Sequence, residues 1–452
     1  MKRYIILVIL VCIGLIGFYS LGMSSSFSKK LYIKPFGNIK TIHGQKFGSE
    51  EAFPMPNDTN MIHWDAGYYS SIRDHLYQNK EAADGDNVWF YAFFPAFPFL
   101  WKITQVGNVF IILLNALLFF AGAYLIIKAL KFPPNHALYF ALPSMVIFFI
   151  PYTEALNFFF LGWAIYAWSK DKKQQLFLAL FASALVRPSF TFLLGAFFAN
   201  EIFHLLAHRS FKNSAKILFL RITPLVLATL VVAGIQLKLG SPNFWQFYHA
   251  QKIWGHELGW PEELKDWSTL GFGINLSILI SLLIPLSTIL FIKFFNLIRN
   301  NIRQIKSEYT FEDQLLTVSM FYFVAIILFV LFFRHGSLHC LFRFTLNTPF
   351  ALVLVILGGK RIHHIPTKLR WLWVLFSFYA TFKLLGTLQF SKEWKMDDLG
   401  FFIYFFVLLQ ILLSVEIPNK IKPYLTAIGI LVACYWSAYL FNWYLNDGWI
   451  FA

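Results

Sequence analysis

Four charged side chains stand among or beside strongly apolar residues. Asp65 lies in the segment HWDAGYYSSIRDHLY, Glu154 in PYTEALNFF, Arg187 in ASALVRPSF, and Arg343 follows a third apolar stretch. A carboxylate at the edge of an apolar environment is partly desolvated, and desolvation raises its pKa toward the range of a general base. Guanidinium groups bind phosphate through several N–H donors. These residue types could therefore accept a proton from a hydroxyl group and bind a phosphate leaving group.

Simpler interpretations of the same residues remain open. Asp65 could cap the N-terminus of a helix by accepting hydrogen bonds from free backbone N–H groups, alone or in addition to a role as a base. Charges inside a membrane cost about 2.5–3.5 kcal/mol each and usually face a cavity or one another. Glu154 and Arg187 could therefore form an ion pair that closes a helix bundle.

A cluster of basic residues surrounds a turn near residue 340. It contains Arg334, His335, His339 and Arg343. Snorkelling of long side chains to lipid headgroups explains one or two of them, whereas a site for a lipid-linked phosphate explains all four.

Composition shows what kind of fold must position these residues. Hydrophobic residues make up 58% of the 452-residue chain and charged residues only 13%, whereas a typical soluble domain is about a quarter charged. Segments long enough to cross a bilayer recur from end to end, and no polar linker divides them. The chain is thus expected to form one all-α integral membrane domain over residues 1–452. About thirteen spans are predicted, at 1–23, 108–128, 137–153, 154–169, 175–189, 190–207, 217–239, 273–293, 314–333, 341–358, 371–389, 400–416 and 424–442.

The first apolar segment and the charged loops predict the orientation. The segment at 1–23 is too long for a signal peptide, so it is interpreted as a span. Every second loop carries Lys or Arg, which places these loops and the N-terminus in the cytoplasm. The net charge of +15 then reflects orientation and contact with anionic lipids, and does not indicate nucleic-acid binding. The two longest loops, 24–87 and 240–270, are expected on the exoplasmic face.

The first exoplasmic loop is expected to contain an interfacial helix followed by a broken apolar segment. Tyr68, Ile72 and Leu76 are spaced at intervals of four, which predicts one apolar helical face, with Trp64 and Tyr69 at headgroup level. In DNVWFYAFFPAFPFLWK, two prolines interrupt the apolar run, so this segment is predicted to dip into the membrane and return.

Five segments, in order, resemble the PIG-V type mannosyltransferases of the GT-C superfamily of polytopic glycosyltransferases. They are HWDAGYY, AFFPAFPFL, PYTEAL, LVRPS and FYHAQKIWG. The resemblance covers about the first 260 residues, and its most specific part is the WD-x-x-Y segment followed by AFFP. It implies a GT-C type bundle and an inverting transfer of mannose from polyprenyl- or dolichyl-phosphate-mannose to a lipid-linked or glycan acceptor, as in the assembly of GPI-type anchors. Inversion of a β-linked donor would give an α-mannoside.

The resemblance also implies roles for individual residues. Asp65 would be the catalytic base. Arg187 and Arg343 would bind the carrier phosphate, and Glu154, Gln251 and Trp254 would line the sugar or acceptor subsite. Trp64 and Tyr68 belong to the same candidate binding set.

No cofactor is expected, because a lipid-phosphate sugar is already activated. The triplet Asp84-Gly85-Asp86 resembles the DxD metal site of other glycosyltransferases, but Asp-Gly is first of all a turn signal. Two other functions stay open: a GT-C transferase for another lipid-linked sugar in envelope-glycan or protein O-glycosylation pathways, and a lipid or lipid-linked sugar flippase or transporter. The C-terminal residues 449–452 carry no retrieval signal, which favours a bacterial plasma membrane over the endoplasmic reticulum.

Overall fold

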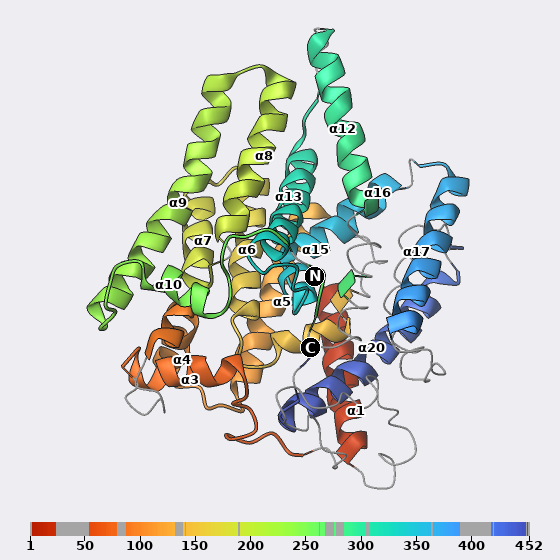
Figure 1. Cartoon of the computed structure of the whole chain (residues 1–452). Coiled ribbons are helices and arrows are strands. Elements are labelled where there is room, and N and C mark those ends of the chain that lie inside the picture. The colour runs from red at the N-terminus through yellow and green to blue at the C-terminus, as the bar shows by residue number, and fades with distance from the viewer. Residues whose placement is uncertain are drawn as a thin grey trace.

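The computed structural model of the chain is built from helices (Figure 1). It describes residues 2–23, 54–78, 87–131, 139–140, 142–188, 190–261, 263–266, 275–276, 284–303, 308–362, 365–388, 417–418, 420–448 and 450. Among these residues the only β-type pairing outside helices is an isolated bridge between Lys265 and Ser337. The helices are α1 (Lys2–Met23), α3 (Asp65–His75), η1 (Asn87–Ala92), α4 (Ala96–Thr104), α5 (Ile111–Leu130), η3 (Pro143–Phe148), α6 (Glu154–Ser169), α7 (Lys173–Val186), α8 (Phe190–His208), α9 (Phe211–Lys238), α10 (Gln246–Ile253), α12 (Ile284–Ile302), α13 (Phe311–Phe332), α14 (Leu341–Thr345), α15 (Pro349–Val353), η5 (Leu354–Gly358), α16 (Gly359–Ile362), α17 (Thr367–Leu388) and α20 (Lys422–Leu445).

Six of the described helices are long and apolar enough to cross a membrane: α1, α5, α8, α9, α13 and α20. A chain with several such helices is a multi-pass membrane protein, as the sequence predicts. The predicted spans at 154–169 and 175–189 correspond to the shorter helices α6 and α7. The predicted spans at 371–389 and 273–293 overlap α17 and α12, and the span at 400–416 lies outside the described residues. The total of thirteen stays a prediction.

Two of the predicted spans are not continuous helices. In the described part of 137–153 the backbone forms the short 3₁₀ helix η3 and a 3₁₀ turn at 139–140, and 341–358 is divided into α14, α15 and the π-helical η5. Backbone carbonyls left open by such breaks need partners inside a membrane protein. The Tyr139 hydroxyl donates to the carbonyls of Leu346 and Thr348, at 2.7 and 3.1 Å, and Asn347 Nδ2 donates to the Ser144 carbonyl at 2.8 Å. The two irregular segments therefore hold each other in place.

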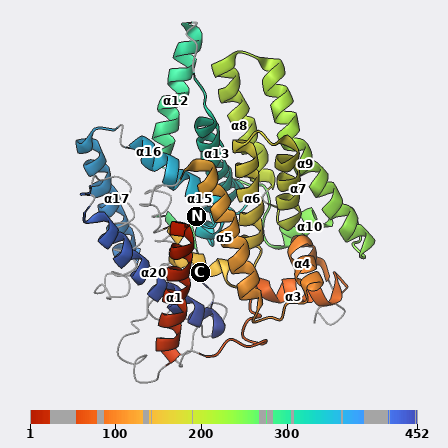
Figure 2. The same cartoon turned by 180° about the vertical axis from the view of Figure 1, so that it is seen from behind.

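Close helix packing fixes the helix that begins with Glu154. Helices α5 and α6 approach so closely at Gly122 and Gly162 that a Cβ on Gly162 would lie 2.7 Å from the Gly122 carbonyl oxygen. Small residues allow this approach between membrane helices. Helix α6 also packs on α7, α7 on α9, α8 on α9 and α13, and α1 on α20 (Figures 1 and 2).

The bundle has two ends of different character. Helices α3, α4 and α10 lie at one end, at the lower left of Figure 1, and we call this the loop end. The turn between α8 and α9 and the C-terminal part of α12 project from the other end, where Arg209 Nη2 donates to the Asn301 carbonyl at 3.0 Å. Arg209 and Lys212 at that turn belong to the loops that the sequence marks as basic. The charge pattern therefore corresponds to a geometric difference between the two ends.

The loop-end helices differ from the expected interfacial arrangement in one respect. Helix α3 forms where predicted, but Tyr69 is buried and points inward, against Phe93 and Phe97. Its hydroxyl lies 3.4 Å from Thr153 Oγ1. Tyr69 therefore packs on protein and not on an exposed face of α3, while the depth of the helix in a membrane stays a prediction. The predicted break occurs: η1 ends at Ala92, and α4 starts after Pro95.

Candidate active site

Asp65 is the first residue of α3, and its side chain forms an ion pair. Trp64 occupies the N-cap position with φ 55°, a backbone conformation that residues with side chains rarely adopt. No side-chain cap hydrogen bond forms there, so the structure does not support the N-cap interpretation of Asp65. Asp65 Oδ2 instead accepts a hydrogen bond from Arg343 Nη1 at 2.6 Å. Asp65 Oδ1 accepts no hydrogen bond from the described residues, which leaves it available to a ligand.

Glu154 joins both arginines to this pair. It is the first residue of α6 and fully buried, and its Oε1 accepts hydrogen bonds from Arg187 Nη1 at 3.0 Å and from Arg343 Nε. The guanidinium of Arg343 also lies 4.5 Å from the ring centre of Tyr152. We call Asp65, Arg343, Glu154 and Arg187 the loop-end network. Its two carboxylates balance its two guanidiniums, as burial requires, and the predicted Glu154–Arg187 ion pair is one part of it.

The irregular segments bring this network together from distant parts of the sequence. Arg343 lies on the five-residue helix α14, which packs against η3. Glu154 begins α6 after a short turn that follows η3, and Arg187 is the C-cap residue of α7. The three charges therefore meet at the loop end of the bundle, the end that carries none of the basic loops.

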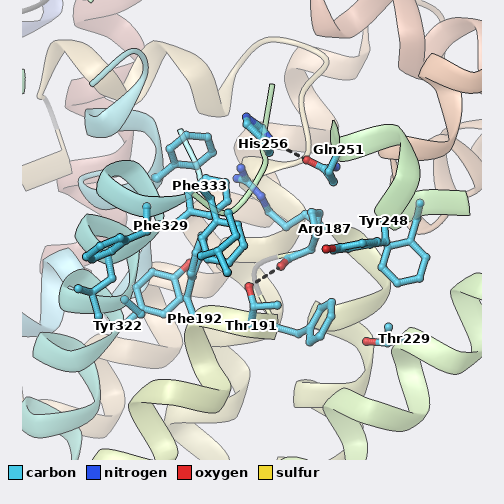
Figure 3. A pocket seen from close by; sticks show the side chains of 18 of the residues that line it. Arg187, Thr191, Phe192, Thr229, Tyr248, Gln251, His256, Tyr322, Phe329 and Phe333 are labelled. Atoms are coloured by element: carbon cyan, nitrogen blue, oxygen red, sulfur yellow. Dashed lines mark hydrogen bonds between the residues drawn. The ribbon is translucent and has the colours of Figure 1, made fainter. Parts of the chain in front are cut away.

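A cavity of about 970 Å³ adjoins the network at Arg187 (Figure 3). Its walls are mainly apolar and aromatic. Among the described residues that line it, only Arg187 carries a permanent charge. The lining comes from the end of α7 and from α8, α9, α10, α13 and α14 with their loops: Arg187, Pro188, Phe190, Thr191, Phe192, Val226, Thr229, Leu230, Trp245, Phe247, Tyr248, Gln251, His256, Leu258, Tyr322, Ala325, Leu328, Phe329, Phe332, Phe333, Phe344 and Thr348. Asp65, Glu154 and Arg343 do not line it, so Arg187 alone connects the network to the cavity.

Helix α10 and the loop after it each add one polar group to the cavity wall, Gln251 and His256. Gln251 Nε2 lies 3.4 Å from the Ala92 carbonyl, and Gln251 Oε1 lies 2.8 Å from His256 Nδ1. Burial, reinforced by the positive charge of Arg334, lowers the pKa of His256 to about 3. Sequence reasoning identified Gln251 but missed His256. The available signal was its position two residues after Trp254, in the same loop.

Trp254 and Tyr68 lie in an aromatic cluster outside the cavity lining. The Trp254 ring contacts the rings of Tyr68, Trp89 and Phe93, at centroid distances of 5.8, 5.1 and 6.1 Å. Trp254 and Trp89 are both partly exposed, at 38% and 36%. The cluster therefore offers apolar ring faces to a ligand at the loop end. Trp64 is half-buried at the start of α3.

The other basic residues near position 340 make contacts within and between loops and are not part of the loop-end network. Arg334 Nη1 donates to the His339 carbonyl at 2.6 Å, and His339 Nδ1 lies 3.7 Å from Asp266 Oδ1. Neither residue lines the cavity, nor does His335. Of the four basic residues, only Arg343 joins the loop-end network.

A metal site is not visible among the described residues, since no group of three or more His, Cys, Asp or Glu side chains gathers there. Asp84 and Asp86 lie outside the described residues, so the structure gives no view of the DxD-like triplet.

Comparisons of the chain with protein-family models, with curated proteins and with solved structures find no match. The resemblance to the PIG-V type enzymes thus rests on its sequence segments alone.

Proposed function

We propose that the protein is a glycosyltransferase that moves a sugar from a polyprenyl- or dolichyl-phosphate carrier to a hydroxyl group of a lipid-linked or glycan acceptor. The observation that carries this proposal is the double position of Arg187, which binds Glu154 in the loop-end network and lines the apolar cavity. A lipid phosphate sugar has the matching shape: an apolar chain, then an anionic phosphate, then a polar sugar. By the resemblance stated above, the sugar is mannose.

The surroundings of the cavity suit a lipid that enters from the bilayer. Its rim includes the exposed apolar side chains of Val226 and Leu230 on α9 and Leu328 on α13. In a membrane protein such surfaces face acyl chains. A polyprenyl chain could therefore enter sideways between α9 and α13, with its phosphate at Arg187, where charge-assisted hydrogen bonds to phosphate are strong.

The chemical step needs one base and one stabilised leaving group. The acceptor oxygen attacks the anomeric carbon and forms the new C–O bond, its proton passes to Asp65 Oδ1, and the bond from the anomeric carbon to the phosphate oxygen breaks. The electron pair of that bond stays on the lipid phosphate, whose negative charge Arg187 stabilises. Arg343 acts through Asp65: its 2.6 Å hydrogen bond to Oδ2 holds the carboxylate in one orientation.

The proposal includes a direction in the membrane. The basic loops at the end opposite to Asp65 favour the cytoplasm by the positive-inside rule. The loop end, with Asp65 and the aromatic cluster, would then face the exoplasmic side of a plasma membrane, or the lumen of the endoplasmic reticulum in a eukaryote.

The test is transfer by the purified protein in lipid nanodiscs. Polyprenyl-phosphate-[³H]mannose is the donor, and a total membrane extract supplies acceptors. We expect the wild type to move label into a new glycosidic product and Asp65→Asn to lose about 10²–10⁴-fold in rate, the usual contribution of a positioned base. Wild-type turnover with other lipid-phosphate sugars would change the sugar but not the reaction class.

Asp74→Asn is the matched control, because Asp74 lies on the same helix and pairs with Arg73 at the exposed side. This variant should transfer at close to the wild-type rate. Asp65→Asn at the wild-type rate would refute the base assignment. Movement of the labelled lipid across a vesicle membrane without any glycosidic product would instead support the flippase or transporter alternative.

A further inference from the structure

We infer that His256 positions the donor sugar by accepting a hydrogen bond from one of its hydroxyl groups, and so distinguishes the sugar-bearing lipid phosphate from the sugar-free carrier that remains after transfer. This inference rests on the proposed function. It adds a residue that selects substrate over product in the same cavity.

The hydrogen bond to Gln251 fixes which nitrogen of His256 carries a proton. Gln251 Nε2 faces the Ala92 carbonyl, so the amide oxygen Oε1 faces His256 Nδ1, at 2.8 Å. An amide oxygen can only accept a hydrogen bond. His256 Nδ1 must therefore be the donor, and in the neutral ring Nε2 keeps a free lone pair. Nε2 makes no hydrogen bond to the described residues.

The ring stays neutral, because burial and the nearby Arg334 oppose its protonation. A neutral Nε2 is an acceptor and cannot donate to a phosphate, whose oxygens are themselves acceptors. The neutral Nε2 can instead accept a hydrogen bond from a hydroxyl group. In this cavity Arg187 is therefore the residue that binds the phosphate, and His256 is the residue that accepts a hydrogen bond from a hydroxyl group.

The position of His256 fits a sugar next to an Arg187-bound phosphate. Figure 3 shows His256, Gln251 and Arg187 together in the upper part of the view, with Tyr322 and Thr229 below them. The Phe329 ring contacts the His256 ring edge-on at 5.2 Å and restricts its orientation. The three threonine hydroxyls of the lining already donate within the protein: those of Thr229, Thr191 and Thr348 donate to the carbonyls of Leu225, Pro188 and Thr345.

The experiment measures binding, which does not require the acceptor to be known. Wild-type protein in nanodiscs is titrated with polyprenyl-phosphate-mannose and with polyprenyl phosphate of the same chain length. We expect His256→Leu to weaken binding of the sugar-bearing lipid about 3–10-fold, the usual range for one hydrogen bond. Binding of polyprenyl phosphate should not change. His256→Gln, whose amide oxygen can reach the place of Nε2, should restore most of the preference.

Thr229→Val is the matched control, since it also removes a polar group from the cavity lining but one that is already bonded within its helix. It should leave both affinities unchanged. Equal weakening of both lipids by His256→Leu, or no change for either, would overturn the role of His256 while leaving the proposed function intact. If wild-type protein binds neither lipid, the proposed function itself fails. Each variant is first checked for a monodisperse elution profile. If His256→Leu does not fold, His256→Phe, which keeps a ring but has no acceptor, takes its place and should show the same selective loss.

Discussion

Two buried charge networks lie at opposite ends of the bundle, and they have similar parts. In the loop-end network, Arg343 and Arg187 bind Glu154, and Arg343 stacks on Tyr152. At the other end, Arg221 Nη1 donates to Glu201 Oε1 at 2.5 Å, and its guanidinium lies 4.1 Å from the ring centre of Trp168. Asn200 and Gln314 complete this second group, which we call the basic-end network.

The networks differ in their backbone and in what they face. The basic-end residues Glu201, Arg221 and Gln314 project from the continuous helices α8, α9 and α13, and none of them lines the cavity. The loop-end network is built on two helix starts, a helix end and the short helix α14, and Arg187 lines the cavity. A buried ion pair alone therefore does not single out the candidate site, because both ends of the bundle have one. What distinguishes the loop-end network is its irregular backbone and the adjoining cavity. The basic-end network only joins three continuous helices.

The largest expected difference is between the two glutamates. Glu154→Gln and Glu201→Gln each remove a charge from a buried network and should lower stability by roughly 3–5 kcal/mol. Only Glu154→Gln should also reduce transfer per folded molecule, by at least about 10²-fold, because Arg187 and Arg343 lose the carboxylate that orients them. Thermal melting in detergent measures the first effect and transfer normalised to folded protein the second. Equal losses of specific activity in both variants would remove the distinction between the networks.

A smaller difference is expected between the two arginines that hold these glutamates. Arg187→Met should raise KM for the lipid donor about 10–100-fold, the range for loss of a charge-assisted hydrogen bond of about 1.5–3 kcal/mol. Arg221→Met should destabilise the fold but leave KM unchanged, since Arg221 does not line the cavity. Initial rates over a range of donor concentrations give both values. A rise in KM with Arg221→Met would mean that the basic-end network communicates with the cavity.

The sequence predicted the regular helices better than the arrangement of the site. Apolar length alone located α5, α8, α9, α13 and α20, because a bilayer sets the length of a span. The same criterion failed at 137–153 and 341–358. Their apolar residues are buried within the protein, and a hydropathy pattern cannot separate a lipid-facing helix from an irregular segment enclosed by other helices.

The sequence identified the charged residues of the candidate site but not which of them contact one another. Asp65, Glu154, Arg187 and Arg343 stood out because charge is costly in an apolar environment. That Arg343 bridges the two carboxylates depends on a contact across 278 residues of sequence from Asp65. His256 was missed because its position two residues after Trp254 is a weak signal that does not distinguish it from other loop histidines. Its significance depends on the cavity and on the orientation of the Gln251 amide.

The smallest expected effect is the pH dependence of the preference for the sugar-bearing lipid, which is governed by the protonation of His256. The pKa of His256 is about 3, so its ring is neutral from pH 5.5 to 8 and the wild-type preference for the sugar-bearing lipid should be flat over that range. Gln251→Glu places a carboxylate beside His256 Nδ1, favours the protonated ring and raises its pKa. As pH falls through that raised value, Nε2 gains a proton and loses its lone pair, so the preference should decline about 3–10-fold at low pH and persist at high pH.

Binding of both lipids at several pH values tests this expectation. His204→Gln is the control from the other end of the bundle, because His204 lies beside Glu201 and bonds to Ser214 without reaching the cavity. Its profile should stay as flat as that of the wild type. If the wild-type preference itself declined between pH 8 and 5.5, His256 would not be the neutral acceptor that its environment indicates. If instead Gln251→Glu and His204→Gln gave the same shift, protonation at the cavity wall would have no special effect on sugar recognition, and the two ends of the bundle would differ in charge pattern alone.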